Sequence, residues 1–168
     1  KIEERTLKQG HRVMLTGVGA AAIAGWLAYY QMRRKNYDIE LVLGSGFYGL
    51  VPRPGDPFIT NLSSFQTCKM IGETIDAYGF LVCGHNRKSI SVLSSGLVDK
   101  YGNIDSAKIS EDIYLTGPGG AGDAYKAQET VLVIEQIKDY FMEKVPHVTS
   151  SGEGVKVLVS SMGIFEKL

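Results

Sequence analysis

The chain has 168 residues, of which 44% are hydrophobic and 21% are charged, a composition typical of a globular protein large enough to bury a core. Its 18 basic and 18 acidic residues give a formal net charge of zero, so charge offers no case for nucleic acid or an anionic membrane as a partner. The two cysteines and three histidines lack metal-ligand spacing, and we expect no metal site and a reducing, cytoplasmic setting.

The amino-terminal part of the chain predicts a βαβ unit. Residues 1–9 are consistent with a short amphipathic helix that ends at Gly10. A strand, a glycine turn, a helix of strong helix formers and a second apolar strand follow. Two strands joined by a helix indicate a parallel sheet. The expected strands and helix occupy residues 11–16, 20–32 and 38–43.

Two alternatives exist for this part of the chain. Residues 13–30 carry no charge, and a segment of this length is at the lower limit for a membrane-spanning helix. Its glycine break and many alanines favour a buried strand, turn and helix instead. The pattern Gly17-x-Gly19-x-x-Ala22 matches a dinucleotide-binding fingerprint. That fingerprint requires an acidic residue at the carboxyl end of the second strand, whereas Asp38 and Glu40 lie at its start.

The middle of the chain is rich in loop signals. Residues 44–57 form a long glycine- and proline-rich loop that leaves the carboxyl end of a predicted parallel strand, where open α/β sheets bind ligands. Cys83 and His85 suggest a nucleophile and a base, although a buried cysteine beside a turn histidine is the commoner arrangement. Further expectations are partial helix over 61–78, an alternating strand over 89–95 and a Gly-Asn turn before 104–109.

Four glycines and a proline fall together in the stretch Gly117-Pro118-Gly119-Gly120-Ala121-Gly122. Such a loop presents bare N–H groups, which suit a phosphate, a carboxylate or an oxyanion, but it is also consistent with a tight turn that holds no ligand. The elements expected after it are a helical turn over 124–128, a buried strand over 130–135, an amphipathic helix over 137–144 and a last strand over 155–160.

Three segments, in the same order along the chain, resemble the β-type subunit of class I coenzyme A transferases. Among these, the β subunit of the glutaconate CoA-transferase type looks most similar. The run Ser94-Ser95-Gly96-Leu97-Val98-Asp99-Lys100-Tyr101-Gly102-Asn103-Ile104-Asp105 resembles the family's Gly-x-x-Asp-x-x-Gly-Asn turn. The run Gly117-Pro118-Gly119-Gly120-Ala121 resembles its Gly-x-Gly-Gly-Ala loop, and residues 141–150 resemble its Phe-x-x-Lys-x-x-x-Val-Thr-Ser stretch. Gly17-Val18-Gly19 lies where the family has its first glycine turn.

The resemblance implies an α/β fold of CoA-transferase, NagB/RpiA-like topology: an open, mostly parallel sheet with helices on both faces and mixed or antiparallel edge strands. It implies one domain over residues 1–168, shorter than the family at the carboxyl end, an α-type partner subunit, and acyl-CoA and carboxylate substrates with no bound cofactor. It assigns binding of CoA or of an oxyanion to the glycine loops. The residues so assigned are Gly46, Gly117, Gly119, Gly120 and Ala121.

The family's nucleophile is a glutamate in a Glu-x-Gly triplet, which forms acyl-glutamyl and glutamyl-CoA intermediates. The matching triplet here is Gly44-Ser45-Gly46, so the nucleophile position has no side chain. Glu40 lies too far back on the same strand to replace it, and Glu73 and Glu129 are candidates only if the fold brings them close. Three options stay open: a partner α-type subunit supplies the acid, as in related enzymes that hydrate or cleave ring ketones on CoA thioesters; the pair performs another reaction, such as acyl-CoA hydrolysis; or the chain is a non-catalytic scaffold.

Overall fold

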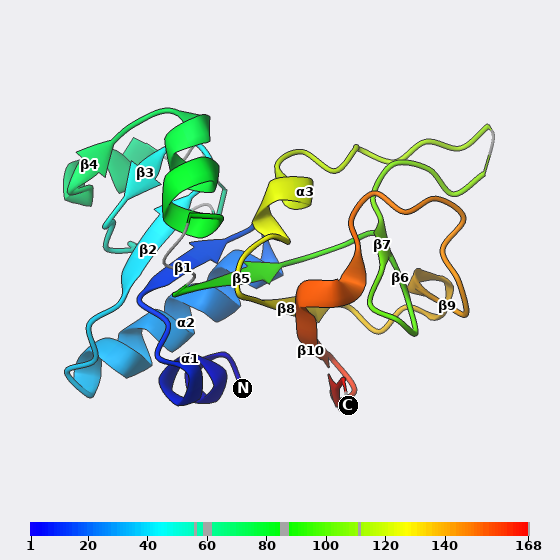
Figure 1. Ribbon diagram of the computed structural model, residues 1–168, viewed down its shortest axis with the longest axis horizontal. Coiled ribbons are helices and arrows are strands. Elements are labelled where there is room, and N and C mark those ends of the chain that lie inside the picture. The colour runs from blue at the N-terminus through cyan, green and yellow to red at the C-terminus, as the bar shows by residue number, and fades with distance from the viewer. Residues whose placement is uncertain (56, 59–61, 85–87, 111, 168) are drawn as a thin grey trace.

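The computed structural model describes residues 1–55, 57–58, 62–84, 88–110 and 112–167. Its main feature is an eight-stranded sheet with the strand order β11-β10-β8-β5-β1-β2-β3-β4 (Figure 1). The five central strands run parallel, and the strands at both edges are antiparallel. The central strands are β1 (Val13–Thr16), β2 (Glu40–Leu43), β5 (Ser89–Leu93), β8 (Glu129–Ile134) and β10 (Val155–Ser160); the edge strands are β3 (Phe47–Tyr48), β4 (Met70–Ile71) and β11 (Ile164–Glu166).

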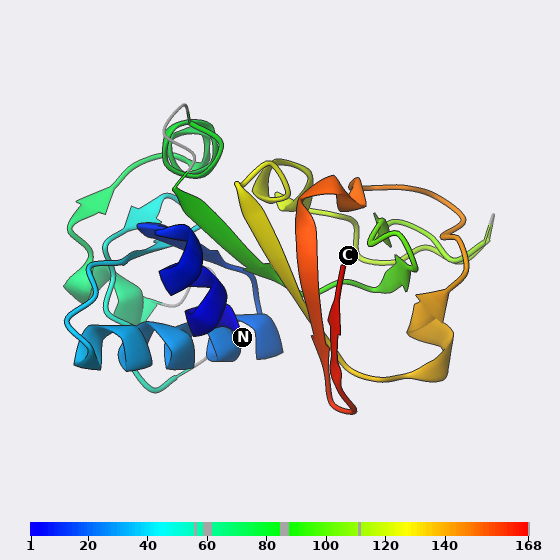
Figure 2. The same cartoon turned by 60° about the horizontal axis from the view of Figure 1, so that its bottom comes forward.

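Helices cover both faces of this sheet, as predicted (Figure 2). One face packs against α1 (Ile2–Gln9) and α2 (Ala20–Arg34), and the other against the π-helix η2 (Asp76–Val82) and the single turn α3 (Ala121–Ala124). Successive side chains of a strand point to opposite faces of the sheet, so Met14 of β1 packs toward α2 and the next residue, Leu15, packs toward η2. Because parallel strands are buried on both faces, they read as continuous apolar runs.

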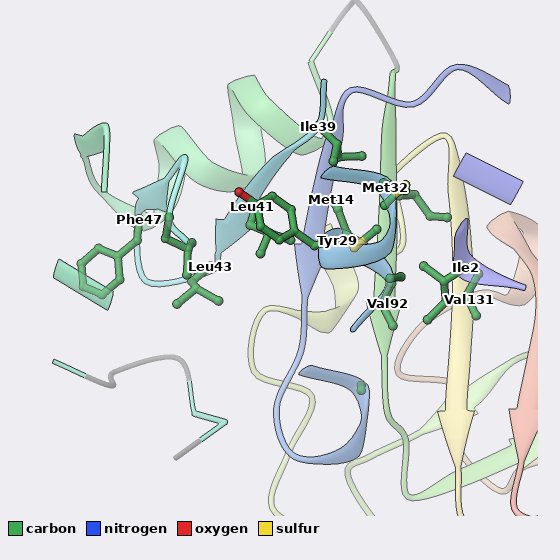
Figure 3. Close-up of a cluster of buried hydrophobic side chains, with 14 of the residues drawn as sticks. Ile2, Met14, Tyr29, Met32, Ile39, Leu41, Leu43, Phe47, Val92 and Val131 are labelled. Atoms are coloured by element: carbon green, nitrogen blue, oxygen red, sulfur yellow. The ribbon is translucent and has the colours of Figure 1, made fainter. Parts of the chain in front are cut away.

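The core beneath α2 shows why the first βαβ unit could be read from the sequence. Figure 3 shows Met14, Leu41 and Val92 of three adjacent strands meeting Tyr29 and Met32 of the helix. All of these side chains are at most 6% exposed. The left-handed Gly10, with φ +70°, ends α1 where glycine was expected to end it.

A second sheet of three short strands, in the order β7-β6-β9, lies beside the β10 end of the large sheet (Figure 1). Its β6–β7 hairpin contains the Gly-Asn turn, so the antiparallel pairing expected after that turn forms a separate sheet rather than an edge of the large one. The strands are β6 (Leu97–Asp99), β7 (Ile104–Asp105) and β9 (Phe141–Met142).

Several predictions of local structure were wrong, and most of the errors involve two- or three-residue strands. The long loop 44–57 contains β3, and the helix expected over 137–144 is a 3₁₀ turn, Lys138–Tyr140, followed by β9. The chain also continues past β10 into β11. Such short strands are fixed by their pairing partners, because so few residues show no periodicity. The region expected to be partly helical holds a 3₁₀ helix over Leu62–Thr67, then β4 and the start of η2; Asn61 lies outside the described residues.

Candidate active site

A groove of about 610 Å³ opens at the carboxyl ends of β1 and β5. The chain goes from β1 to β2 on one side and then returns to β5 on the other, so this edge is the point where the direction of strand addition reverses. Open α/β sheets bind ligands at this switch point. The groove is lined by Val18, Ser94, Ser95, Gly96, Ser106, Tyr114, Leu115, Thr116, Gly117, Pro118 and Ala121.

The glycine loop contributes one wall of the groove, and its N–H groups divide into two kinds. The N–H of Gly117 donates to the carbonyl of Ser106 (2.8 Å), and that of Ala121 donates to the carbonyl of Pro118 (2.9 Å). The N–H groups of Gly119 and Gly120 have no acceptor among the residues that the structure describes. The loop therefore keeps two adjacent donors available for a ligand oxygen, as an anion cradle requires.

The other two resembling segments hold this loop in place. The carboxylate of Asp105 is fully buried and accepts hydrogen bonds from the N–H groups of Ala107, Lys108 and His147 at 2.9–3.1 Å. The hydroxyl of Thr149 donates to the carbonyl of Ile104 and accepts from the N–H of Ser106, whose own carbonyl receives the Gly117 N–H. The Val-Thr-Ser stretch thus supports the glycine loop through β7.

The Gly-Asn turn is also structural. Asp99 accepts hydrogen bonds from the N–H groups of Tyr101 and Asn103, and the side-chain oxygen of Asn103 accepts from the N–H of Gly152. Gly102 has φ +82° and packs closely against Val155 at the start of β10. Its conformation and its close contact both favour glycine there. This segment joins the small sheet to the large one.

Position 44, at the end of β2, faces the hydroxyl of Tyr78. A β-carbon built on Gly44 would overlap the Tyr78 hydroxyl oxygen and lie 2.8 Å from ring atom Cζ. A β-carbon built on Gly120 would overlap the same hydroxyl and lie 2.7 Å from Cε2. The structure therefore brings Gly44 and the glycine loop together around one tyrosine. Sequence reasoning did not single out Tyr78, and the only local signal was its place before Gly79 in the segment expected to be partly helical.

Gly46, the third residue of the triplet, packs against the chain after β4. Its φ is +99°, its N–H donates to the carbonyl of Leu43 (3.0 Å), and its carbonyl accepts from the N–H of Gly72 (2.9 Å). A β-carbon on Gly46 would overlap the Gly72 backbone and approach that of Glu73 to 3.2 Å. The exposed Glu73 therefore lies beside Gly46, whose own N–H is already hydrogen-bonded within the chain.

The other two carboxylates lie elsewhere. Glu40, at the start of β2, forms an ion pair with Lys69 (2.5 Å). Glu129, at the amino end of β8, forms a two-pronged ion pair with Arg5 and lies 3.8 Å from Nε2 of the buried His11. Burial favours a higher pKa for Glu129, but His11 and Arg5 outweigh it and hold the pKa of this carboxyl below its ordinary value. Neither carboxylate lies at position 44, where the resemblance places the nucleophile.

The structure gives no support to the cysteine or dinucleotide alternatives. Burial, with Asp123 nearby, raises the pKa of the Cys83 thiol, whose sulfur lies 3.1 Å from the Asp123 carbonyl; His85 lies outside the described residues. In the first glycine turn, the N–H groups of Gly17 and Gly19 donate to carbonyls of the chain itself rather than facing a groove.

Neither metal ligands nor a membrane span is found in the described parts of the chain. No three histidine, cysteine or acidic side chains gather there as a metal would require. Along the same ranges, no helix combines the length and the apolar character needed to cross a bilayer.

Two proteins similar in sequence to this chain are B subunits of CoA-transferases. No protein-family model matches it. The chain is 28% identical over 155 residues to the B subunit of 3-oxoadipate CoA-transferase from Pseudomonas knackmussii, a match that covers 89% of the chain and 58% of that relative. It is 25% identical over 155 residues to the B subunit of glutaconate CoA-transferase from Acidaminococcus fermentans, covering 88% and 57%. The chain thus spans less than three-fifths of the length of these relatives.

Solved structures agree on the fold. Glutaconate CoA-transferase from Acidaminococcus fermentans superposes with a TM-score of 0.80 at 22% identity, over 98% of this chain and 72% of that chain. The decarboxylase AibA/AibB superposes with a TM-score of 0.74 at 19% identity, over 92% and 66%. The chain is therefore similar in sequence to the B subunits of CoA-transferases and has the CoA-transferase fold.

Proposed function

We propose that this chain is one subunit of an enzyme of the CoA-transferase superfamily that acts on acyl-CoA thioesters. The observation that carries the proposal is the pair of N–H donors at Gly119 and Gly120, held beside a groove at the switch point of the sheet. A thioester carbonyl that develops negative charge is the kind of group that such donors stabilise. The names of the two similar proteins support the same substrate class.

The chemistry proposed for the enzyme is CoA transfer between an acyl-CoA and a carboxylic acid, with coenzyme A thioester as a substrate and no resident cofactor. Gly44 supplies no carboxylate, so a covalent transfer needs an acid from outside this position. We propose that an α-type partner subunit supplies it, since the two similar proteins are named as B subunits. The exposed Glu73 beside Gly46 is the candidate within the chain.

A second candidate function is hydrolysis or carbon–carbon bond cleavage of an acyl-CoA, with the catalytic acid on the partner. The observation that favours it is the Tyr78 side chain, which fills the space that a side chain at position 44 would need. A reaction that passes through an oxyanion without an enzyme-bound anhydride needs the donors and not the glutamate.

The location we propose is the cytoplasm, where acyl-CoA substrates and reduced cysteines are expected together. Neither Cys68 nor Cys83 forms a disulfide, which is consistent with this setting.

The test combines binding with activity. We expect CoA and acetyl-CoA to bind the chain in calorimetry, and we expect activity only when an α-type subunit is added. Transferase activity should then be measured with a carboxylate acceptor, and hydrolase activity without one. Activity of the pair that depends on Glu73, tested as Glu73→Gln, would assign the acid to this chain; activity unchanged by that substitution would assign it to the partner. If the chain binds no CoA and shows no activity, alone or with the α-type subunit, the proposal that it belongs to an enzyme is refuted and a non-catalytic scaffold is the reading that is left.

A further inference from the structure

Tyr78 reaches the candidate site from the π-helix η2, far in sequence from the two glycines that enclose its hydroxyl. A β-carbon at either Gly44 or Gly120 would overlap the hydroxyl oxygen, so in this arrangement both positions require glycine. The tyrosine side chain is only half-buried, although its hydroxyl end lies between two main-chain segments. The π-helix places it there, and such helices are often found at functional sites.

The hydroxyl of Tyr78 is free to act on a ligand. No described residue forms a hydrogen bond with it. Burial raises the pKa of Tyr78, and the nearby Asp123 and Cys83 raise it further. The phenol therefore keeps its proton at neutral pH and can donate a hydrogen bond.

Two main-chain donors lie next to this hydroxyl. Gly120, whose α-carbon is in contact with Tyr78, has an N–H without an acceptor among the described residues, and so has Gly119 before it. Sites that stabilise an oxyanion combine main-chain N–H groups with hydroxyl or amide side chains aimed at the same point. The Tyr78 hydroxyl lies beside Gly120, and the N–H groups of Gly119 and Gly120 have no acceptor among the described residues, so all three donors are available in one place.

We propose that Tyr78 donates a hydrogen bond to the thioester carbonyl oxygen of a bound acyl-CoA, together with the N–H groups of Gly119 and Gly120. This inference rests on the proposed function and adds a residue to its site. The hydroxyl occupies the space in front of position 44 where the family has its carboxylate, and it acts there as a donor and not as a nucleophile. Such a donor stabilises negative charge on the thioester oxygen as the reaction proceeds.

The test compares two ligands that differ in the thioester carbonyl. Calorimetry on the full chain should measure the Kd of acetyl-CoA and of CoA for the unmodified protein and for Tyr78→Phe, with Tyr101→Phe as a matched control on an exposed tyrosine of the Gly-Asn turn. Loss of one hydrogen bond should weaken acetyl-CoA about three- to tenfold and leave CoA unchanged. In infrared spectra, the thioester carbonyl band of bound acetyl-CoA should move to higher frequency in Tyr78→Phe alone.

Three results would overturn the inference. An equal effect of Tyr78→Phe on both ligands, or no effect on either, would remove the donor role and leave the proposed function standing. Tighter acetyl-CoA binding by Tyr78→Ala would show that the side chain obstructs the ligand instead of donating a hydrogen bond to it. Failure of both ligands to bind the unmodified protein would refute the proposed function, and the inference would fall with it.

Discussion

The contact between Gly44 and Tyr78 makes a quantitative prediction about stability. In Gly44→Ala the new methyl group would overlap the Tyr78 hydroxyl and lie 2.8 Å from Cζ, where carbon atoms normally stay about 3.5–4.0 Å apart. The ring must move by on the order of 1 Å, and overpacking of this kind costs about 1–3 kcal/mol. Tyr78→Ala should cost about 2 kcal/mol, since the side chain is half-buried and complete burial gives about 3–5 kcal/mol.

The two substitutions together should cost less than their sum. Once the ring is absent, the alanine at position 44 has nothing to displace, so the double variant should recover about 1–2 kcal/mol of coupling energy. Urea unfolding followed by circular dichroism measures all four proteins of this cycle.

The control is Gly122→Ala, in α3 directly after the glycine loop, where a β-carbon meets nothing within 4 Å. It should be neutral or stabilising by up to about 1 kcal/mol, because alanine is the better helix former in α3, and it should add to Tyr78→Ala without coupling. Additivity of Gly44→Ala and Tyr78→Ala within about 0.5 kcal/mol would refute the packing of Tyr78 against position 44.

Three further predictions follow from other contacts. With an α-type partner present, Gly44→Glu alone should not raise the transferase activity of the pair, because Tyr78 fills the space that the new carboxylate needs. Gly44→Glu with Tyr78→Ala should raise it, and equal activities of the single and double variants would contradict this. Arg5→Met should cost about 3 kcal/mol, since Glu129 is left buried without its partner. The pKa of Glu129 is lowered in the folded chain, so its ion pair contributes its full stability above pH 4.5 and loses it as the pH falls below that value. The unfolding midpoint of Arg5→Met should therefore depend less on pH between about 5 and 3 than the midpoint of the unmodified protein does. Asp105→Ala should cost about 2–4 kcal/mol in urea and weaken acetyl-CoA binding through the loop that Asp105 supports, and the exposed Asp112→Ala should do neither.

Much of the central fold could be predicted from the sequence. The strands β1, β2, β8 and β10 and the helices α1 and α2 were predicted to within a few residues. The strands could be found because a parallel sheet buries both of its faces, so its strands are continuous apolar runs in the sequence. The glycine loop was also identified there, since several glycines so close together indicate unusual backbone angles or close approach. Gly117 and Gly119, with φ of +91° and +51°, confirm the first of these.

The small sheet and the edge strands could not be predicted in this way. Two-residue strands such as β3 and β9 are defined by a hydrogen-bonding partner, and the partner of β9 is β6, which lies far away in sequence. The same holds for the support of the glycine loop, in which Asp105 and Thr149 act from distant segments. These contacts exist only after the chain has folded.

Position 44 separates what the sequence determines about the site from what only the tertiary structure determines. A glycine stands at position 44 whatever the fold, and the resemblance to the family predicts from this that the usual nucleophile is absent. That a tyrosine hydroxyl fills the same space is decided by the fold alone. Tyr78 belongs to η2, and only the packing of η2 against β2 and α3 brings its ring between Gly44 and Gly120. No local pattern encodes a contact among three segments that are far apart in the chain.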